Sequence, residues 1–269
     1  MFLTGLPVAM QGAVAGPLVR PAAPFPGSPV LFWLAAGPAE GKWMDRVVRF
    51  ERDEEWKGFV ALAAVGLETK PGAHILRMED GTEHRVRVAA HAYRTGKLTV
   101  PPKFVSPPKA VLKRIAAERE KKKTAFAART KRQWQGAFAA PAETPQTSPF
   151  GTRRTYNGKT QSIHQGLDFR AAVGTPILAA NRGVVTIAEE MYYEGGFVVV
   201  DHGEGLFTLY MHLSSFHVKA GERVEKGQKL ALSGSSGRVT GPHLHFGVQW
   251  QGLYMEPGTL LGLRTGEKG

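Results

Sequence analysis

Short apolar runs between turn residues dominate the chain from residue 26 to residue 101. Each run is bounded by glycine, proline or charged residues, and the pattern predicts strands at 29–35, 45–51, 58–64, 74–78 and 82–88. Asp80 and Gly81 separate the last two runs, and they suit a hairpin turn because glycine accepts the positive φ that such a turn needs. Strands this short and this evenly spaced predict a small β-sandwich over residues 26–101.

The segment from residue 109 to about residue 133 is helix-forming and dense in lysine and arginine. Val111, Leu112 and Ile115 fall on one helical stripe, and Glu118 lies four residues before Lys122, a favourable helical pair. Because the apolar stripe is short, we expect the helix to dock at one end and to be solvated at the other. With the prolines before it and the low-complexity residues 139–149 after it, this helix predicts a proline-rich and basic helical linker over residues 102–149.

From residue 150 to residue 265, apolar strands punctuated by glycine dominate and helices are scarce. This pattern predicts a compact antiparallel β domain, so the whole chain is predicted to be mostly β. The turns in residues 218–234 also resemble those of biotinyl or lipoyl carrier domains. A carrier or scaffold domain is therefore the non-enzymatic alternative at this point.

The first 25 residues fit either an export leader or a disordered tail. Residues 2–15 are mostly apolar and residues 13–15 resemble a signal-peptidase site, but no basic segment precedes them and Gly5 and Pro7 interrupt the run. No run of 18 apolar residues occurs in the sequence, so we predict no transmembrane segment.

Composition and charge narrow the classes of partner. With 269 residues, the chain is long enough for two domains, each with its own core. Its formal charge of +12 indicates an anionic partner, but no nucleic-acid-binding motif accompanies the charge, so we predict no nucleic acid. The basic cluster at 119–132 is either a solvated face or a surface attracted to an anionic polymer such as the cell wall. The absence of cysteine excludes disulfides and cysteine-ligated zinc.

Two histidines lie two residues apart in the sequence TGPHLHFG at residues 240–247. In a strand, His243 and His245 would point to one face about 6–7 Å apart, while Leu244 and Phe246 point into a core. The plain alternative is a strand with two surface histidines. His202, by contrast, lies just before two glycines and is predicted to be structural.

A second group of candidate ligands lies upstream, where His164 and Asp168 are four residues apart. A turn at Gly166 would bring both side chains to one point, because glycine tolerates backbone angles that other residues avoid. Histidine nitrogen and aspartate oxygen are both zinc ligands, and with His245 they would leave a fourth tetrahedral position for water. A further histidine, His212, lies in an apolar strand-like run and titrates in the range that proton transfer requires.

These motifs occur in the order His-x-x-x-Asp, Tyr-x-His-Leu and Gly-x-x-x-Gly-Pro-His-x-His-Phe. The region from about residue 150 to residue 263 thereby resembles the lysostaphin/LytM-type zinc metallopeptidases. The resemblance implies Zn²⁺ ligands at His164, Asp168 and His245, and catalytic histidines at His212 and His243. None of these residues is missing, which argues against an inactive member.

The resemblance implies a zinc endopeptidase that cleaves peptide crosslinks of bacterial peptidoglycan, with metal-bound water as the nucleophile. It would act outside the cytoplasm, in the periplasm or cell envelope, after export. Because no His-Glu-x-x-His motif supplies a glutamate base, we assign His243 as base or proton shuttle and His212 as its partner, and we expect Tyr156 to face the oxyanion. The alternative is a catalytically silent regulator that binds another wall hydrolase or its substrate. The β-sandwich at 26–101 resembles the immunoglobulin-like modules that often precede such a domain, and residues 150–265 would form the antiparallel β peptidase domain with a metal groove.

Overall fold

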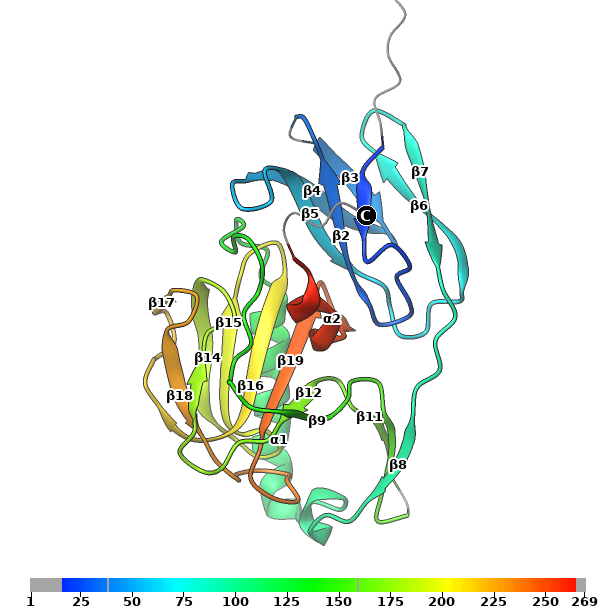
Figure 1. The fold of residues 1–269 in the computed structure, drawn as a ribbon. Coiled ribbons are helices and arrows are strands. Elements are labelled where there is room, and N and C mark those ends of the chain that lie inside the picture. Colours follow the sequence, from blue (N-terminus) through cyan, green and yellow to red (C-terminus); the bar gives the residue numbers. More distant parts are fainter. Residues whose placement is uncertain (1–15, 38, 159, 265–269) are drawn as a thin grey trace, which may run out of the picture.

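A computed structural model of the protein describes residues 16–37, 39–158 and 160–264 (Figure 1). The fold is mostly β, as the sequence predicted, with an amino-terminal sheet packed beside a larger carboxy-terminal sheet. No helix in this described part of the chain has both the length and the apolar character that crossing a membrane requires.

The amino-terminal sheet has seven antiparallel strands in the order β1-β2-β5-β4-β3-β6-β7. Their bounds are Leu18–Arg20 (β1), Pro29–Leu34 (β2), Ala39–Trp43 (β3), Arg46–Asp53 (β4), Gly58–Ala64 (β5), Gly72–Met78 (β6) and Glu83–Val88 (β7). All five predicted strands are present, whereas β1 and β3 were not predicted and β1 falls in the range assigned to a leader or tail. Strand β4 pairs with β3 through residues 46–50 and with β5 through residues 51–53, so one hydrogen-bonded path joins all seven strands. The immunoglobulin-like topology stays a prediction.

The carboxy-terminal sheet has ten strands, and seven of them form the path β17-β14-β15-β16-β19-β12-β9. Strands β13, β18 and β20 pair at its sides. Their bounds are Gln146–Ser148 (β9), Leu167–Phe169 (β12), Pro176–Leu178 (β13), Gly183–Met191 (β14), Gly195–Asp201 (β15), Leu206–Phe216 (β16), Arg223–Val224 (β17), Lys229–Ser233 (β18), Leu244–Trp250 (β19) and Leu253–Met255 (β20). All named pairings are antiparallel, as predicted for this region. Strand β9 lies within the low-complexity segment 139–149.

A small third sheet links the two larger ones at the edge of the molecule (Figure 1). It contains β8 (Thr95–Leu98), β10 (Arg153–Tyr156) and β11 (Thr160–Ile163). Strand β8 runs parallel to β10, and β11 runs antiparallel to it. A 3₁₀ turn, Pro102–Phe104, and helix α1, Lys109–Phe126, then lead toward the larger carboxy-terminal sheet.

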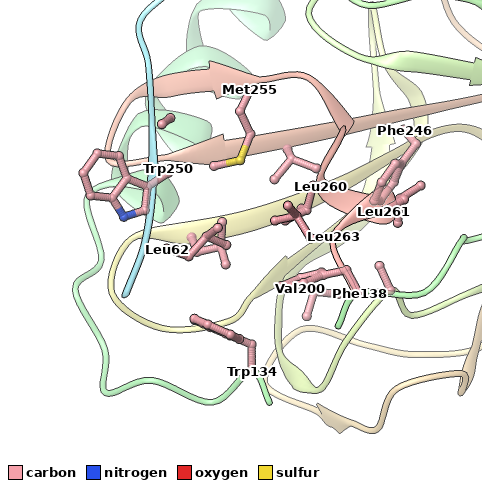
Figure 2. Close-up of a cluster of buried hydrophobic side chains, with 14 of the residues drawn as sticks. Leu62, Trp134, Phe138, Val200, Phe246, Trp250, Met255, Leu260, Leu261 and Leu263 are labelled. Atoms are coloured by element: carbon pink, nitrogen blue, oxygen red, sulfur yellow. The ribbon is translucent and has the colours of Figure 1, made fainter. Parts of the chain in front are cut away.

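One cluster of buried apolar side chains extends through both large sheets. Figure 2 shows part of it, where Leu62 of β5 and Trp134 lie near Trp250 of β19 and near the short helix α2, Pro257–Gly262. The cores of the two predicted domains are therefore continuous with each other, and the division into domains stays a prediction. The segment around Trp134 and helix α2 fill the space between the sheets with apolar side chains, so that the two cores merge.

Helix α1 lies across the outer face of the carboxy-terminal sheet (Figure 1). At its carboxy-terminal end, Phe126 packs against Phe207 with ring centroids 5.4 Å apart, whereas Leu112 near the other end is exposed. Tyr192 N also donates to Glu118 Oε2 at 2.9 Å, so the contacts of the helix are not confined to one end. The basic cluster is not simply a solvated face. Lys121 pairs with Glu189 of β14 at 2.7 Å, and Lys122 pairs with Glu194.

Candidate metal centre and its cavity

Three predicted ligands meet where β12 pairs with β19. Asp168 stands directly opposite His245 in the antiparallel register, and His164 precedes β12 on the same connection. His164 Nε2 lies 2.9 Å from Asp168 Oδ1 and 2.9 Å from His245 Nδ1, and His245 Nδ1 lies 2.9 Å from the same Oδ1. The sequence prediction that these side chains converge is confirmed. We call these three residues the ligand triangle.

Gly166 is required in this connection for a different reason than the sequence suggested. A Cβ at this position would meet His245 Nε2 at 2.4 Å and the carbonyl oxygen of Phe246 at 2.6 Å. Its φ is not in the positive region that favours glycine. The glycine therefore serves close approach of the second strand, and the predicted unusual backbone angle is wrong.

The donor set of the ligand triangle fits a divalent cation. His164 Nδ1 lies 2.9 Å from the carbonyl oxygen of Pro149, which can only accept, so Nδ1 carries the proton of a neutral ring and Nε2 has a lone pair. One proton on His245 Nδ1 cannot satisfy three mutual contacts, since His164 Nε2 and Asp168 Oδ1 are both acceptors. A divalent cation such as zinc, which takes histidine nitrogen and aspartate oxygen as ligands, would satisfy all three atoms.

Arg154 of β10 holds the other oxygen of the carboxylate. Its Nη2 lies 3.2 Å from Asp168 Oδ2, while Oδ1 faces the two imidazoles. Burial alone would raise the pKa of Asp168, but the two imidazoles beside Oδ1 outweigh it and hold the pKa well below its ordinary value. Burial also lowers the pKa of His245, against the opposing effect of Asp168. Both shifts favour the charge states in which these groups bind metal.

The two other predicted histidines lie beside the ligand triangle. The rings of His212 and His243 have centroids 4.8 Å apart, and His243 Nε2 is 3.8 Å from Asp168 Oδ1. His212 Nδ1 lies 2.9 Å from the carbonyl oxygen of Ser236, and His243 Nδ1 lies 2.8 Å from that of Gly241. Each Nδ1 therefore donates to a backbone carbonyl, which leaves each neutral ring with an acceptor at Nε2.

His212 occupies an unusual backbone position in the middle of β16. Its φ is +67°, where a side chain is strained, and its backbone N donates to the carbonyl oxygen of Glu194 at 2.8 Å. Burial lowers the pKa of its imidazole to about 3, with smaller contributions from His245 and His243. The ring is therefore neutral at physiological pH.

All five residues line one cavity of about 540 Å³. Leu244 and Phe246 point the other way and are buried, as the His-x-His alternation predicted. Tyr156 also lines the cavity, with its ring centroid 4.8 Å from Cζ of Arg238. The structure thus brings every predicted site residue to one place.

Four further charged residues of the cavity were not predicted: Arg154, Lys122, Glu194 and Arg238. The alternation of β10 could have suggested that one of Arg153 and Arg154 faces inward, but not which of the two. Lys122 and Arg238 carried no signal, because the first belongs to a helix with many lysines and the second to a loop.

A model of peptidase family M23 matches residues 162–257. The chain carries a family M23 peptidase domain. The resemblance to lysostaphin/LytM-type metallopeptidases is confirmed at this level, and the M23 match includes the ligand triangle and both neighbouring histidines.

Curated relatives match the chain over part of their length. The peptidoglycan DD-endopeptidase ShyA of Vibrio cholerae is 44% identical over 101 residues, which are 37% of this chain and 24% of that protein. The peptidoglycan DD-endopeptidase ShyC of the same organism is 41% identical over 115 residues, 42% of this chain and 27% of that protein. The chain thus spans about a quarter of the length of these curated relatives.

The arrangement of both sheets also has a counterpart. A crystal structure of a candidate peptidase M23 from Pseudomonas aeruginosa matches with a TM-score of 0.70 and 28% identity, over 89% of this chain and 95% of that chain. Because the match covers most of the chain, the amino-terminal sheet beside the M23 domain is not peculiar to this protein.

Proposed function

We propose that the protein is a zinc-dependent endopeptidase that cleaves peptide crosslinks of bacterial peptidoglycan. The observation that carries the proposal is the ligand triangle, in which three groups that bind zinc lie 2.9 Å from one another beside two further histidines. A carrier or scaffold domain would not require a set of buried metal-binding acceptors at one place.

His164, Asp168 and His245 would hold the zinc ion. When bound, zinc polarises a carbonyl and lowers the pKa of a water molecule to about 7, so that a nucleophile forms at neutral pH. Pro149 keeps the ring of His164 in the tautomer that binds metal through Nε2. Arg154 donates to Oδ2 of Asp168 and thereby directs Oδ1 toward the zinc site.

His243 is the better candidate for the general base. Burial lowers the pKa of His212 to about 3, which makes it a poor base near neutral pH, whereas His243 is less enclosed and has its acceptor Nε2 near the triangle. His212 would then be the partner that stabilises the oxyanion or protonates the leaving amine. Because its Nδ1–H is bound to Ser236, its Nε2 has to gain that proton during turnover. We keep Tyr156 as a candidate donor to the oxyanion, since it lines the same cavity.

The names of the relatives support a proposal for the substrate and the place of action. Their name, peptidoglycan DD-endopeptidase, favours crosslinks of D-amino acids over glycine bridges. Peptidoglycan lies outside the cytoplasm, so we propose that the protein acts in the periplasm or cell envelope. We also keep the proposal that residues 26–101 form an immunoglobulin-like module that positions the substrate, ahead of a linker at 102–149 and the peptidase domain at 150–265.

Defined muropeptide dimers test the proposal. Purified protein should release monomers, the release should stop with a chelator, and added zinc should restore it. Intact dimers under all three conditions would instead favour the catalytically silent regulator.

Two single substitutions test the division of labour between the histidines of the His-x-His pair. His243→Ala should retain stoichiometric zinc but lose turnover by on the order of 10²- to 10⁴-fold, as expected for a general base. His245→Ala should lose both zinc and turnover. Equal zinc content in the two variants would contradict the assignment of His245 as a ligand and His243 as a base.

A further inference from the structure

The charged side chains that line the cavity are not all neutralised. Lys122 pairs with Glu194, and Arg154 pairs with Asp168. Arg238 lines the same cavity, yet it forms no ion pair with any carboxylate in the part of the chain that the structure describes. One positive charge is therefore left for a group that the protein does not supply.

Arg238 is held in position by two aromatic rings. Its Cζ lies 4.8 Å from the ring centroid of Tyr156 and 5.1 Å from that of Tyr193. Its backbone N also donates to the carbonyl oxygen of Tyr193 at 2.8 Å. A guanidinium that lies over aromatic rings keeps N–H groups available for a planar anion such as a carboxylate. Because the side chain is already ordered, little conformational entropy would be lost on binding.

The loop that carries Arg238 also orients both catalytic histidines. Ser236, two residues before Arg238, accepts from His212 Nδ1, and Gly241, three residues after it, accepts from His243 Nδ1. The loop is fixed at Gly237, which has φ +73° and where a Cβ would lie 2.4 Å from the backbone N of Gly195. Arg238 therefore lies on the side of the cavity with the two histidines that we propose to transfer protons. The leaving amine has to lie on this side because it must receive a proton.

We propose that Arg238 binds a carboxylate on the substrate residue that supplies the amine of the scissile bond. This inference rests on the proposed function and adds a selection rule to it: the site prefers crosslinks with a free carboxylate beside the scissile amide. A D-Ala–diaminopimelate crosslink has such a carboxylate on the carbon that bears the amide nitrogen. An amide inside a glycine bridge has none.

A matched pair of muropeptide dimers tests this rule. Both are crosslinked through diaminopimelate, with the carboxylate beside the scissile amide free in one and converted to a carboxamide in the other. The wild-type protein should cleave the carboxylate form with a kcat/KM about 10- to 100-fold higher, as expected for a charged hydrogen-bonded pair. Arg238→Gln should bring the ratio near one by lowering kcat/KM for the carboxylate form.

Two further variants control for indirect effects. Arg238→Lys keeps the charge without the planar edge, so an intermediate ratio is expected even if Arg238→Gln disturbs the two tyrosines. Arg153→Gln removes an exposed arginine of β10, the strand that also carries Tyr156. Its nearest carboxylate is Glu68 at 3.8 Å, and the variant should keep the wild-type ratio. Thermal unfolding of all three variants verifies that they are folded.

The outcomes separate this inference from the proposed function. Equal cleavage of both dimers by the wild type, or an unchanged ratio in Arg238→Gln, would overturn the role of Arg238 while the endopeptidase assignment stands. If the wild type cleaves neither dimer, the proposed function fails. Calorimetric binding of the same two dimers then decides on Arg238, because equal affinities would overturn its role and a preference lost in Arg238→Gln would support it.

Discussion

Two buried carboxylates, each paired with an arginine, have opposite surroundings in this protein. Asp53, at the end of β4, is 2% exposed and meets Arg132, and Asp168, in β12, is 7% exposed and meets Arg154. Every other partner of Asp53 is a donor, since the backbone N atoms of Glu55, Trp56 and Gly136 lie 2.9–3.1 Å from its oxygens. Asp168 Oδ1 faces the nitrogen atoms of two imidazoles that also face each other.

The difference is the one that we propose between a structural carboxylate and a metal ligand. A buried carboxylate surrounded by donors has its hydrogen bonds satisfied, and it holds the donating segments in place. Asp168 has a donor from Arg154 only at Oδ2, and Oδ1 is the atom that we propose to bind the zinc ion. The four substitutions below alter one side of this comparison at a time.

The largest effect is expected for Asp168→Asn. The amide keeps the shape of the side chain but removes the charge at the centre of the ligand triangle. Zinc should be absent after dialysis, and cleavage of muropeptide dimers should fall by on the order of 10³-fold or more. The circular dichroism spectrum should stay that of the wild type. A variant with one zinc per chain and normal turnover would contradict the ligand role of Asp168.

Asp53→Asn should have the reverse profile. It leaves Arg132 buried without its charged partner, and breaking a buried pair in this way costs about 3–5 kcal/mol of unfolding free energy. Denaturant unfolding measures the loss, and zinc content per folded chain should be unchanged. The exposed Asp45→Asn is the matched control and should change the free energy of unfolding by less than about 0.5 kcal/mol. A loss of zinc in folded Asp53→Asn would erase the distinction between the two carboxylates.

His202 extends the comparison to histidines, because both of its nitrogens have partners. Nδ1 lies 2.7 Å from the carbonyl oxygen of Arg182 and Nε2 lies 2.7 Å from Thr208 Oγ1, which supports the structural role predicted from the sequence. Burial lowers the pKa of His202 to about 4, against a smaller effect of the Arg182 carbonyl.

The unfolded chain therefore takes up a proton at His202 near pH 6.5, before the folded protein does. The stability that this histidine contributes is complete above pH 6.5 and is lost as the pH falls toward 4, by roughly 3 kcal/mol. Urea unfolding of metal-free protein at pH 7 and pH 4 measures the loss. His202→Gln should lose correspondingly less over the same interval, and equal losses in both proteins would refute the prediction.

The smallest effect is expected for Arg154→Gln, which touches Asp168 only at Oδ2. Removing such a support of a metal ligand typically weakens metal binding by about 10- to 100-fold. Competition with a chelator of known affinity measures the change, and Arg153→Gln on the same strand is the control. Unchanged zinc affinity in Arg154→Gln would mean that the ligand triangle orients itself without this arginine.

The site was predictable from the sequence because its motifs are local. His243 and His245 lie two residues apart, so strand periodicity suggested that they share a face. His164 and Asp168 lie four residues apart, and the predicted turn between them suggested that they converge. The register that sets Asp168 opposite His245 spans 77 residues, and no local pattern in the sequence predicted it. The predicted role of Gly166 was wrong because its actual role depends on a strand that is distant in sequence.

The arrangement of the sheets was less predictable, because long-range pairs determine it. Arg132 and Asp53 are 79 residues apart, and neither residue type favours burial. Lys121 and Lys122 of α1 pair with glutamates that are 68 and 72 residues away in the sequence, on β14 and just after it. The sequence alone therefore showed only a basic helix. Strand β3 contains glutamate, lysine and glycine, which weaken its apolar pattern.

The merged core has a consequence for how the two halves of the molecule behave together. Arg46 of β4 donates to the carbonyl oxygen of Gln251 at 3.1 Å, and the Gln251 amide donates to that of Val47 at 2.9 Å, so polar contacts reinforce the apolar seam. Swinging the amino-terminal sheet aside would expose Trp134 and Trp250 to water. The amino-terminal sheet is therefore packed rigidly against the rest of the molecule and should not move about a hinge. Both halves should unfold in a single cooperative transition.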